Sequence, residues 1–600
     1  MEHHSPELIY KTEKEKRESE LAALTKKQTR LGWLRLVIIL ITIVLAFRFF
    51  AFSLGAGWIV VLLGIGIFLF VVSTDADNNK KLKNAKKLLA VNEEEVAILS
   101  GDYSNRYNGA DLAPSVHDYA NDLDILGNYS LYQYVQRCNS QQGRRLLAHD
   151  LLQSISAIEV KERHEAIKEL ALLLQWRQQL QAYSLQAPVQ LATQQKTQKW
   201  LQQPEQYFSS PSWKWVVPLY SLITVSTAVL TLLGYIPGAL FTGIFLLYFI
   251  FSGSLSKKAM KAYAYLSGMV EEIQTVHQLI KWIEEKKFSA SLLNRLQESV
   301  KVEGSKASDQ INALKQILNR FDLRLNIFVF IFLNSFLLWD VRQMMHLNKW
   351  RVKNKEKLSK WYELIAQFEV LTSLSTLHFN QPTWVFPKLA EQHFTLEGEN
   401  IGHPLLPSAQ RVSSGFTLRG EGKVALVTGS NMAGKSTFLR SLGVNIILAQ
   451  MGAPVCAASL TISPVHLMSS MRISDNLAEN TSTFYAELKK LKTIIEAVNR
   501  HEHIFILLDE ILRGTNSLDR HTGSEALIRQ LIKQKAVAVI ATHDVALSTL
   551  EETYPSAIEN YHFDVQVEGE ELYFDYKLKE GVCTSLNASI LMKKIGIEMS

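Results

Sequence analysis

Residues 424–437 read VALVTGSNMAGKST, and this stretch decides the fold of the C-terminal third of the chain. Its apolar first half is typical of a buried β-strand, and its second half follows the pattern G-x-x-x-x-G-K-[ST]. Glycines in such a loop let backbone N–H groups surround phosphate oxygens, and the helix that follows adds the positive end of its dipole. The stretch therefore predicts a strand, a phosphate loop and a helix that together bind a nucleoside triphosphate.

Side chains of this loop have distinct expected roles. We expect Lys435 to reach the β- and γ-phosphate oxygens and Ser436 to ligate Mg²⁺. ATP and Mg²⁺ are accordingly the predicted cofactors. The predicted ATP-binding residues are Gly429, Ser430, Asn431, Met432, Ala433, Gly434, Lys435, Ser436 and Thr437.

Two further apolar runs end in polar residues. Residues 504–510 read IFILLDE, which predicts a buried strand whose end places Asp509 in the Mg²⁺ shell and Glu510 beside the attacking water. Residues 536–543 read AVAVIATH, which puts His543 at the rim of the site, either as a contact of the γ-phosphate or as a structural residue. Alternating strands and helices predict a parallel α/β sheet with its ligand at the carboxyl ends of the strands.

Several segments together resemble the ATPase domain of the MutS family of mismatch-repair proteins. They are the loop Gly429–Thr437 with its Asn431-Met432 pair, Leu448–Ala457, Ser482–Leu488 and Asp509–Ser517. Upstream, Ile401–Leu406 looks like the start of that domain, and residues 129–147 are similar to the beginning of the family's helical core, or lever. The resemblance covers roughly residues 120–598 and is strongest after residue 400.

The resemblance implies a dimer with composite sites. In this family a serine is presented to the γ-phosphate held by the partner subunit, and here that serine is Ser482. The implied catalytic residues are therefore Glu510, Ser482 and His543, and the implied partners are a second copy of the chain and DNA. Ser430 and Ala433 depart from the family's usual proline and glycine, and Thr481 stands where a basic residue is common. These departures keep phosphate binding but leave the rate of turnover open.

Two long apolar stretches predict transmembrane hairpins. Residues 36–74 carry one charge, Arg48, and residues 215–256 carry none. Because a span needs about 20 apolar residues, each stretch is long enough for two short spans, with breaks near Gly55 and near residues 234–238. Lysines flank both hairpins and are absent from their turns, so we expect both turns on the outer side of the cell (inner or plasma) membrane and the ATPase domain in the cytoplasm, with Arg48 as the one dissonant residue. Buried helices of a water-soluble protein are the disfavoured alternative.

Other features are less decisive. Residues 326–339 are apolar but interrupted by Asn334 and too short for a span, so they predict a lever-core helix or a membrane-surface contact. The three cysteines, Cys138, Cys456 and Cys583, lack a metal-binding spacing. Before Asp122 we find no Phe-x-Glu mispair-reading domain like that of mismatch readers in the family. The net charge of +6 is modest, so DNA binding rests on the resemblance and not on composition.

The predicted fold class is α plus α/β, with a helical core that carries two transmembrane hairpins and is followed by a parallel α/β phosphate-loop NTPase domain of the ABC-like, MutS type. The expected domains are a basic cytoplasmic tail (1–35), a hairpin (36–74), a helical core (76–212), a hairpin (213–256), a second core or lever part (257–395) and the ATPase domain (396–600).

Three functions fit this architecture. The first is a membrane-anchored, dimeric, DNA-binding MutS-like clamp driven by ATP hydrolysis. The second is a transporter-type ATPase, which is disfavoured because residues 480–484 read NTSTF where a transporter has Leu-Ser-Gly-Gly-Gln, and because the hairpins offer no charged pathway residues. The third is an ATP-switched membrane organiser that binds no nucleic acid.

Overall fold

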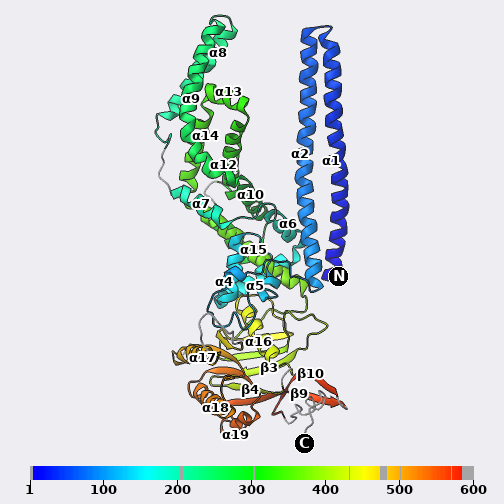
Figure 1. The fold of residues 1–600 in the computed structure, drawn as a ribbon, viewed down its shortest axis with the longest axis vertical. Coiled ribbons are helices and arrows are strands. Elements are labelled where there is room, and N and C mark those ends of the chain that lie inside the picture. The colour runs from blue at the N-terminus through cyan, green and yellow to red at the C-terminus, as the bar shows by residue number, and fades with distance from the viewer. Residues whose placement is uncertain are drawn as a thin grey trace. The chain divides into compact units, whose positions relative to one another are not determined.

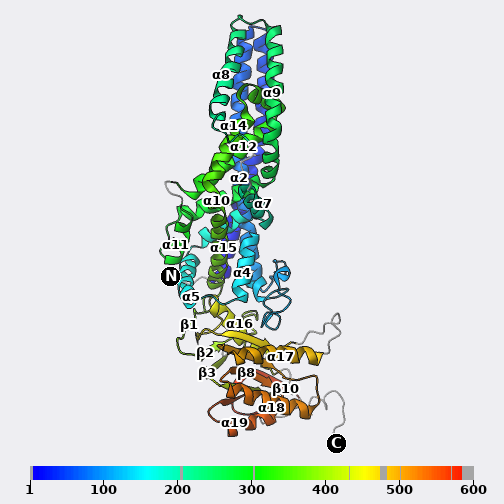
Figure 2. The same cartoon turned by 90° about the vertical axis from the view of Figure 1, so that its left-hand side faces the viewer.

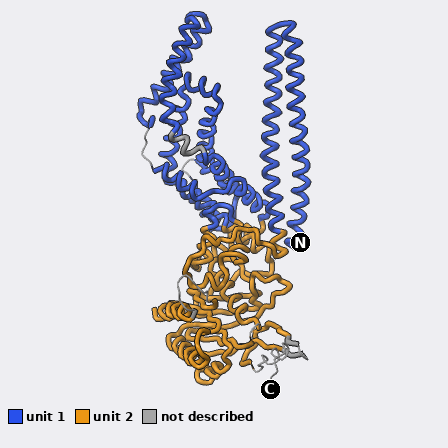
Figure 3. The backbone as a smooth tube through the Cα atoms, in the orientation of Figure 1, with its two compact units in different colours: residues 1–95, 138–144, 173–369 blue, residues 96–137, 145–172, 370–600 orange. Residues whose placement is uncertain are grey.

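The computed structural model describes residues 5–202, 207–301, 305–430, 433–472, 483–500, 502–568 and 571–583. The chain divides into two compact units, which Figure 3 distinguishes by colour. Unit 1 comprises residues 1–95, 138–144 and 173–369, and unit 2 comprises residues 96–137, 145–172 and 370–600. Unit 2 thus includes, besides residues 370–600, two segments from the first part of the expected helical core, and the expected domain bounds stay predictions.

Unit 1 begins with a hairpin of two very long helices, α1 (Pro6–Phe50) and α2 (Leu54–Leu99) (Figure 1). The Ser5 hydroxyl caps α1 by accepting a hydrogen bond from the Leu8 amide at 3.3 Å. Residues 6–35, which the sequence predicts to be a basic tail, form the first part of α1. Polar contacts join the two helices below the apolar stretch: Gln28 Nε2 donates to Asn79 Oδ1 at 2.6 Å, and Arg35 pairs with Asp75 at 3.2 Å.

The second apolar stretch forms a shorter hairpin of α8 (Trp213–Leu232) and α9 (Gly238–Leu266). Four helices in the described part of the chain are thus long and apolar enough to cross a membrane: α1, α2, α8 and the part of α9 up to Met260. Their turns, at residues 51–53 and 233–237, lie where the sequence predicts breaks. Whether these helices lie in a bilayer stays a prediction.

The rest of unit 1 is helical. Its further helices are α6 (Leu174–Ser184), α7 (Leu191–Gln202), η2 (Ser267–Met269), α10 (Val270–Glu285), α11 (Ser291–Ser299), α12 (Ala307–Asp322), η3 (Leu323–Leu325), α13 (Ile327–Leu337) and α14 (Trp339–Asn354). The axes of α13 and α14 meet at an angle of 77°. The chain passes from one unit to the other within α2, α4 (Gln141–Leu152) and α15 (Leu358–Asn380).

Unit 2 contains two sheets (Figure 2). The larger sheet has the order β10-β9-β4-β8-β7-β6, in which only β10 runs antiparallel to its neighbour. Its strands are β4 (Val424–Thr428), β6 (His466–Ser470), β7 (Ile504–Asp509), β8 (Val537–Thr542), β9 (Ile558–Glu568) and β10 (Glu571–Glu580). The smaller sheet has the order β1-β5-β2-β3, formed by β1 (Lys388–Leu389), β2 (Thr395–Ile401), β3 (Ser414–Arg419) and β5 (Ser459–Ile462).

The central strands β4, β7 and β8 are buried at every residue, which explains why their sequences are apolar without alternation. Helix α16 (Lys435–Gln450) packs between β7 and β8 of the larger sheet and β2 of the smaller one. The opposite face of the larger sheet packs on α17 (Thr483–Asn499) and α18 (Ser517–Lys533). The other helices are η1 (Ala110–Leu112), α3 (Leu131–Val135), α5 (Ala157–Leu172), η4 (Val545–Thr549) and α19 (Leu550–Thr553).

This arrangement confirms a mixed helical and α/β fold with parallel central strands. The smaller sheet and the antiparallel edge strand β10 are additions that the sequence does not predict. The carboxyl ends of β4, β7 and β8 lie side by side, because these strands are neighbours in the sheet and run in one direction. The predicted site residues that follow these strands are thereby brought to one edge.

Candidate functional site

The turn between β4 and α16 has a glycine with positive φ at each of its ends. Gly429, directly after β4, has φ 147°, and Gly434, the residue before α16, has φ 105°. A Cβ atom at Gly429 would lie 3.0 Å from the carbonyl oxygen of Phe563, so only glycine fits there. Asn431 and Met432, also predicted to bind ATP, lie outside the described residues.

Lys435 is the first residue of α16 and is buried, with 5% of its surface exposed. Its ammonium group donates to the carbonyl oxygens of Gly429 at 2.8 Å and Ser430 at 2.9 Å. Burial lowers the pKa of Lys435 to about 8, against a smaller opposing effect of Glu510. The ammonium group is therefore folded onto the carbonyl oxygens of its own loop.

Glu510 follows β7 in a left-handed backbone conformation, with φ 53°. One carboxylate oxygen contacts Nε2 of His543, and the other accepts from Nε of Arg513 at 2.7 Å. The hydrogen bond from His543 is the main reason that the pKa of Glu510 is lowered. The other ring nitrogen of His543, Nδ1, lies 3.0 Å from the Gly429 carbonyl oxygen. His543 thus bridges the phosphate-loop turn and the end of β7.

Asp509 is the last residue of β7 and is 7% exposed. Its Oδ1 atom is buried and has no hydrogen-bond partner among the described residues, and its Oδ2 atom lies 3.9 Å from Arg513. A buried carboxylate oxygen without a partner, with the hydroxyl of Ser436 on the first turn of α16, fits the oxygen ligands that Mg²⁺ prefers. No cluster of three or more histidine, cysteine or acidic residues that could hold a metal occurs in the described part of the chain.

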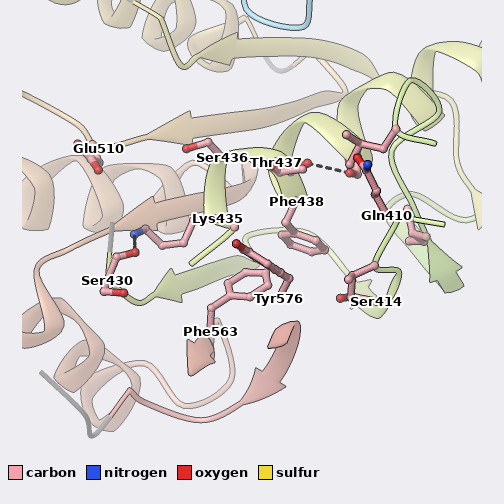
Figure 4. A pocket seen from close by; sticks show the side chains of 15 residues that line it. Gln410, Ser414, Ser430, Lys435, Ser436, Thr437, Phe438, Glu510, Phe563 and Tyr576 are labelled. Atoms are coloured by element: carbon pink, nitrogen blue, oxygen red, sulfur yellow. Dashed lines mark hydrogen bonds between the residues drawn. The ribbon is translucent and has the colours of Figure 1, made fainter. Parts of the chain in front are cut away.

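A cleft of about 300 Å³ opens beside these residues (Figure 4). Ser430, Lys435 and Ser436 line it on one side, the rings of Phe563 and Tyr576 lie next to them, and Gln410 and Ser414 lie at its far end. A polar loop at a helix N-terminus with aromatic rings beside it offers groups that suit the phosphates and the base of a nucleotide. The remaining lining residues are Ile401, Leu406, Val412, Gly434, Thr437, Phe438, Ser441 and Glu510.

Comparison with known proteins agrees with the motifs. A family model described as MutS domain V matches residues 425–594, the part of the chain that contains the loop, β7 and β8. Over these residues the chain is similar to the MutS family.

Several similar curated proteins carry the name "DNA mismatch repair protein MutS". That of Thermotoga petrophila is 32% identical over 234 residues, which are 38% of this chain and 29% of that protein. That of Thermotoga maritima is 31% identical over 235 residues, with the same two shares, and that of Thermotoga neapolitana is 30% identical over 236 residues, 38% and 28% of the two chains. The match therefore spans less than a third of the length of these relatives.

The segment that MutS resemblance assigns to the partner's γ-phosphate is only partly described, because Ser482 lies outside the described residues. Its C-terminal continuation is α17. Glu487 on α17 accepts a hydrogen bond from the Leu512 amide at 2.6 Å, and burial raises the pKa of Glu487. A Cβ atom at Gly514 would lie 2.6 Å from Cβ of Phe484. The start of α17 is thus packed against the turn that positions Glu510.

Residues on either side of 473–482 are held by hydrogen bonds and an ion pair to Asp122. The buried carboxylate of Asp122 accepts from the Arg472 amide at 3.0 Å and from the Ser469 hydroxyl at 2.7 Å, and it pairs with Lys490 on α17. Both flanks of residues 473–482 therefore contact one carboxylate. Sequence reasoning missed Asp122 because 350 positions separate it from Arg472, and it assigned no role to Arg513, although Arg513 stands within a motif that it recognised.

Proposed function

We propose that this protein is a membrane-anchored MutS-like ATPase that works as a dimeric DNA-binding clamp related to mismatch repair. The observation that carries the proposal is the meeting of Lys435, Asp509, Glu510 and His543 at the ends of three neighbouring parallel strands, beside a cleft lined by polar groups and aromatic rings. The family relationship supports it, since the similar curated proteins are named as DNA mismatch repair proteins.

In the proposed mechanism, Lys435 exchanges the carbonyl oxygens of Gly429 and Ser430 for phosphate oxygens of ATP. Ser436 and the unpartnered oxygen of Asp509 would hold Mg²⁺, which when bound neutralises charge on the phosphates. Glu510 orients the attacking water. Because both of its carboxylate oxygens are occupied here by His543 and Arg513, at least one of these contacts must open before Glu510 can hold water.

Hydrolysis by a dimer follows from the family resemblance of Ser482, whose hydroxyl would complete the site of a partner copy. The contacts of α17 with the turn after Glu510 support a coupling of this kind. A change at the start of α17 would be passed through Glu487 to the Leu512 amide, and so to the turn that holds Glu510. When Ser482 of one subunit engages the nucleotide of its partner, the nucleotide site of that first subunit would respond through α17.

Membrane anchoring is part of the proposal and rests on the four apolar helices and on the flanking lysines. The sequence left Arg48 as the one dissonant residue, since a charge in the hydrocarbon is costly. In the structure Arg48 lies in the last turn of α1, three residues before Ala51, where the hairpin turn begins. This place lets its guanidinium reach the outer interface.

ATP binding and hydrolysis by detergent-solubilised protein test the enzymatic part. Lys435→Ala should abolish nucleotide binding, whereas Lys423→Ala should not, because Lys423 precedes β4 and pairs with Glu559 outside the cleft. Equal binding by both variants would contradict the site. Crosslinking of nucleic acid to the purified protein, with and without ATP, tests the clamp. Hydrolysis without any crosslinked nucleic acid would favour a membrane organiser.

A further inference from the structure

Helix α13 is short, apolar and uncovered. Its sequence, IFVFIFLNSFL, is polar only at Asn334 and Ser335, and both of these side chains are buried. The opposite face is open, since Ile327, Phe328 and Phe332 are 65%, 73% and 59% exposed. Eleven residues of α-helix measure about 16 Å, roughly half of a bilayer core of about 30 Å. The helix is too short to cross a membrane and too apolar on its open face to prefer water.

The position of α13 along the second hairpin is given by its contacts with α8 and α9 (Figure 1). The rings of Phe332 and Phe336 lie 6.4 and 5.6 Å from the ring of Phe245 on α9. Phe245 is seven residues beyond the start of α9, which places it about 10 Å from the hairpin turn. Thr224, which contacts α13 from α8, is about 12 Å from the other end of the same turn. Helix α13 therefore lies beside the middle of the apolar hairpin.

The backbone at the end of α13 is fully hydrogen-bonded without water. A helix that ends inside hydrocarbon leaves its last carbonyl groups unpaired, at a high cost, unless protein groups reach them. All four of these carbonyl oxygens accept a hydrogen bond: Asn334 O from Leu338 N (3.0 Å), Ser335 O from Tyr220 Oη (2.9 Å), Phe336 O from Thr224 Oγ1 (2.7 Å) and Leu337 O from Arg342 Nε (2.9 Å). At the other end, the Asn326 side chain accepts from the amides of Phe328 and Val329. Helices α8 and α14 thus supply what water would supply elsewhere.

The charged residues that precede and follow α13 are turned towards the protein. Arg324 pairs with Asp340 at 3.2 Å, and their side chains are 13% and 0% exposed. Arg342, besides its bond to α13, donates to the Ser221 hydroxyl at 2.9 Å. Charged residues at membrane depth are tolerated when they are paired and face the protein, as these do.

We propose that α13 is a re-entrant segment that enters the acyl-chain region of the bilayer beside α8 and α9 and leaves on the side from which it came. The proposal rests on the membrane anchoring of the second hairpin. A return to the same side is required because α14 is no span, since it carries Asp340, Arg342 and three further cations towards its end. A fifth crossing would also place the ATPase domain on the side opposite to the N-terminus. Lipid is the occupant of the open face, because α8 and α9, which contact α13, expose apolar side chains of their own, such as Ile223 and Leu246.

The experiment measures the surroundings of single labelled positions in reconstituted vesicles. Phe328→Cys, Leu246→Cys and Val352→Cys are each labelled with a bimane fluorophore. The first reports on α13, the second on a proposed span, and the third on α14, where Val352 is 66% exposed. The unsubstituted protein is the labelling blank, because its three cysteines are buried. Each sample is quenched by phosphatidylcholine brominated in mid-chain and, separately, by aqueous iodide.

We expect position 328, like position 246, to lose most of its emission to brominated lipid and little to iodide, and position 352 to show the reverse. Quenching of position 328 by iodide, with position 246 quenched by lipid, would overturn the re-entrant segment and leave the hairpin intact. Protection of position 328 from both quenchers would also overturn it, in favour of a second copy covering the face. Quenching of position 246 by iodide alone would instead refute membrane anchoring, and with it the basis of the proposal.

Discussion

Replacing Glu510 by glutamine separates ATP binding from ATP hydrolysis in the proposed mechanism. Glutamine keeps the shape of the side chain but removes the charge that accepts from His543 and Arg513. It cannot orient and polarise the attacking water as a carboxylate does. We expect hydrolysis to slow by about 10² or more, which corresponds to about 2.7 kcal/mol of barrier, while ATP still binds.

The chain offers a matched control for this change. Glu502 is also held between a histidine and an arginine, at 3.0 Å from Nδ1 of His466 and 2.7 Å from Nε of Arg500, but it lies outside the nucleotide cleft. Glu502→Gln therefore removes a carboxylate with the same kind of partners without touching the site. Its turnover should equal that of the unsubstituted protein.

The assay is phosphate release under saturating ATP, accompanied by equilibrium binding of a fluorescent ATP analogue. Saturation makes the comparison one of turnover and not of affinity. The reasoning is refuted if Glu510→Gln turns over ATP within about twofold of the unsubstituted protein, because a change of about 0.4 kcal/mol is too small for the loss of a water-positioning carboxylate. It is equally refuted if Glu502→Gln slows hydrolysis as much as Glu510→Gln does.

Three further outcomes are expected. Mixing subunits that carry Ser482→Ala with subunits that carry Glu510→Gln should restore part of the ATPase activity, because one site of each mixed dimer keeps both residues; a monomer with full activity at every concentration would exclude this. The pKa of Lys435 is about 8, so its ammonium group loses its proton as the pH rises from 7.5 to 9.5, and ATP affinity should fall by up to about tenfold per pH unit above 8. Lys435→Arg stays charged and should show a flat profile, and an unsubstituted protein with the same affinity at both pH values would contradict the assignment. A cysteine at Ile236 should react with an impermeant maleimide in intact cells; reaction only after lysis would mean that α8 and α9 do not span the membrane.

The parts of the fold that the sequence predicts are those with a strong local signal. The strands β4, β7 and β8 are continuous apolar runs because both faces of the central sheet are covered, and each leads directly into residues of the predicted site. The glycines of the loop stand where positive φ angles and close backbone approach exclude a side chain. The hairpins are also predicted by a local signal, since their helices carry almost no charged residues over roughly 20 positions each.

The parts that escape prediction depend on contacts between distant residues. Nothing local to Asp122 shows that its carboxylate will hold the Arg472 amide and Lys490. The pairing of Glu510 with Arg513 depends on the left-handed turn at Glu510, a conformation that a sequence pattern does not specify. For α13, hydropathy alone does not distinguish a helix of the protein core from one that contacts the membrane. The hydrogen bonds from Tyr220 and Thr224 to its last carbonyl groups come from α8, and only the structure reveals them.

The unbroken course of α2 has a mechanical consequence. Beyond its apolar stretch the helix runs on from Asp75 to Leu99, about 37 Å of rigid rod, and it passes from unit 1 into unit 2 at residue 96. If α2 spans a bilayer as proposed, its tilt adjusts to the bilayer thickness, and a change in tilt of about 10° moves the far end of such a rod by about 6 Å. ATP turnover measured in vesicles of two acyl-chain lengths would reveal this coupling as a difference in rate, and equal rates would show that the displacement is absorbed elsewhere. The thickness of the membrane would then affect the rate of ATP turnover, because the tilt of α2 displaces the end of the helix that enters unit 2.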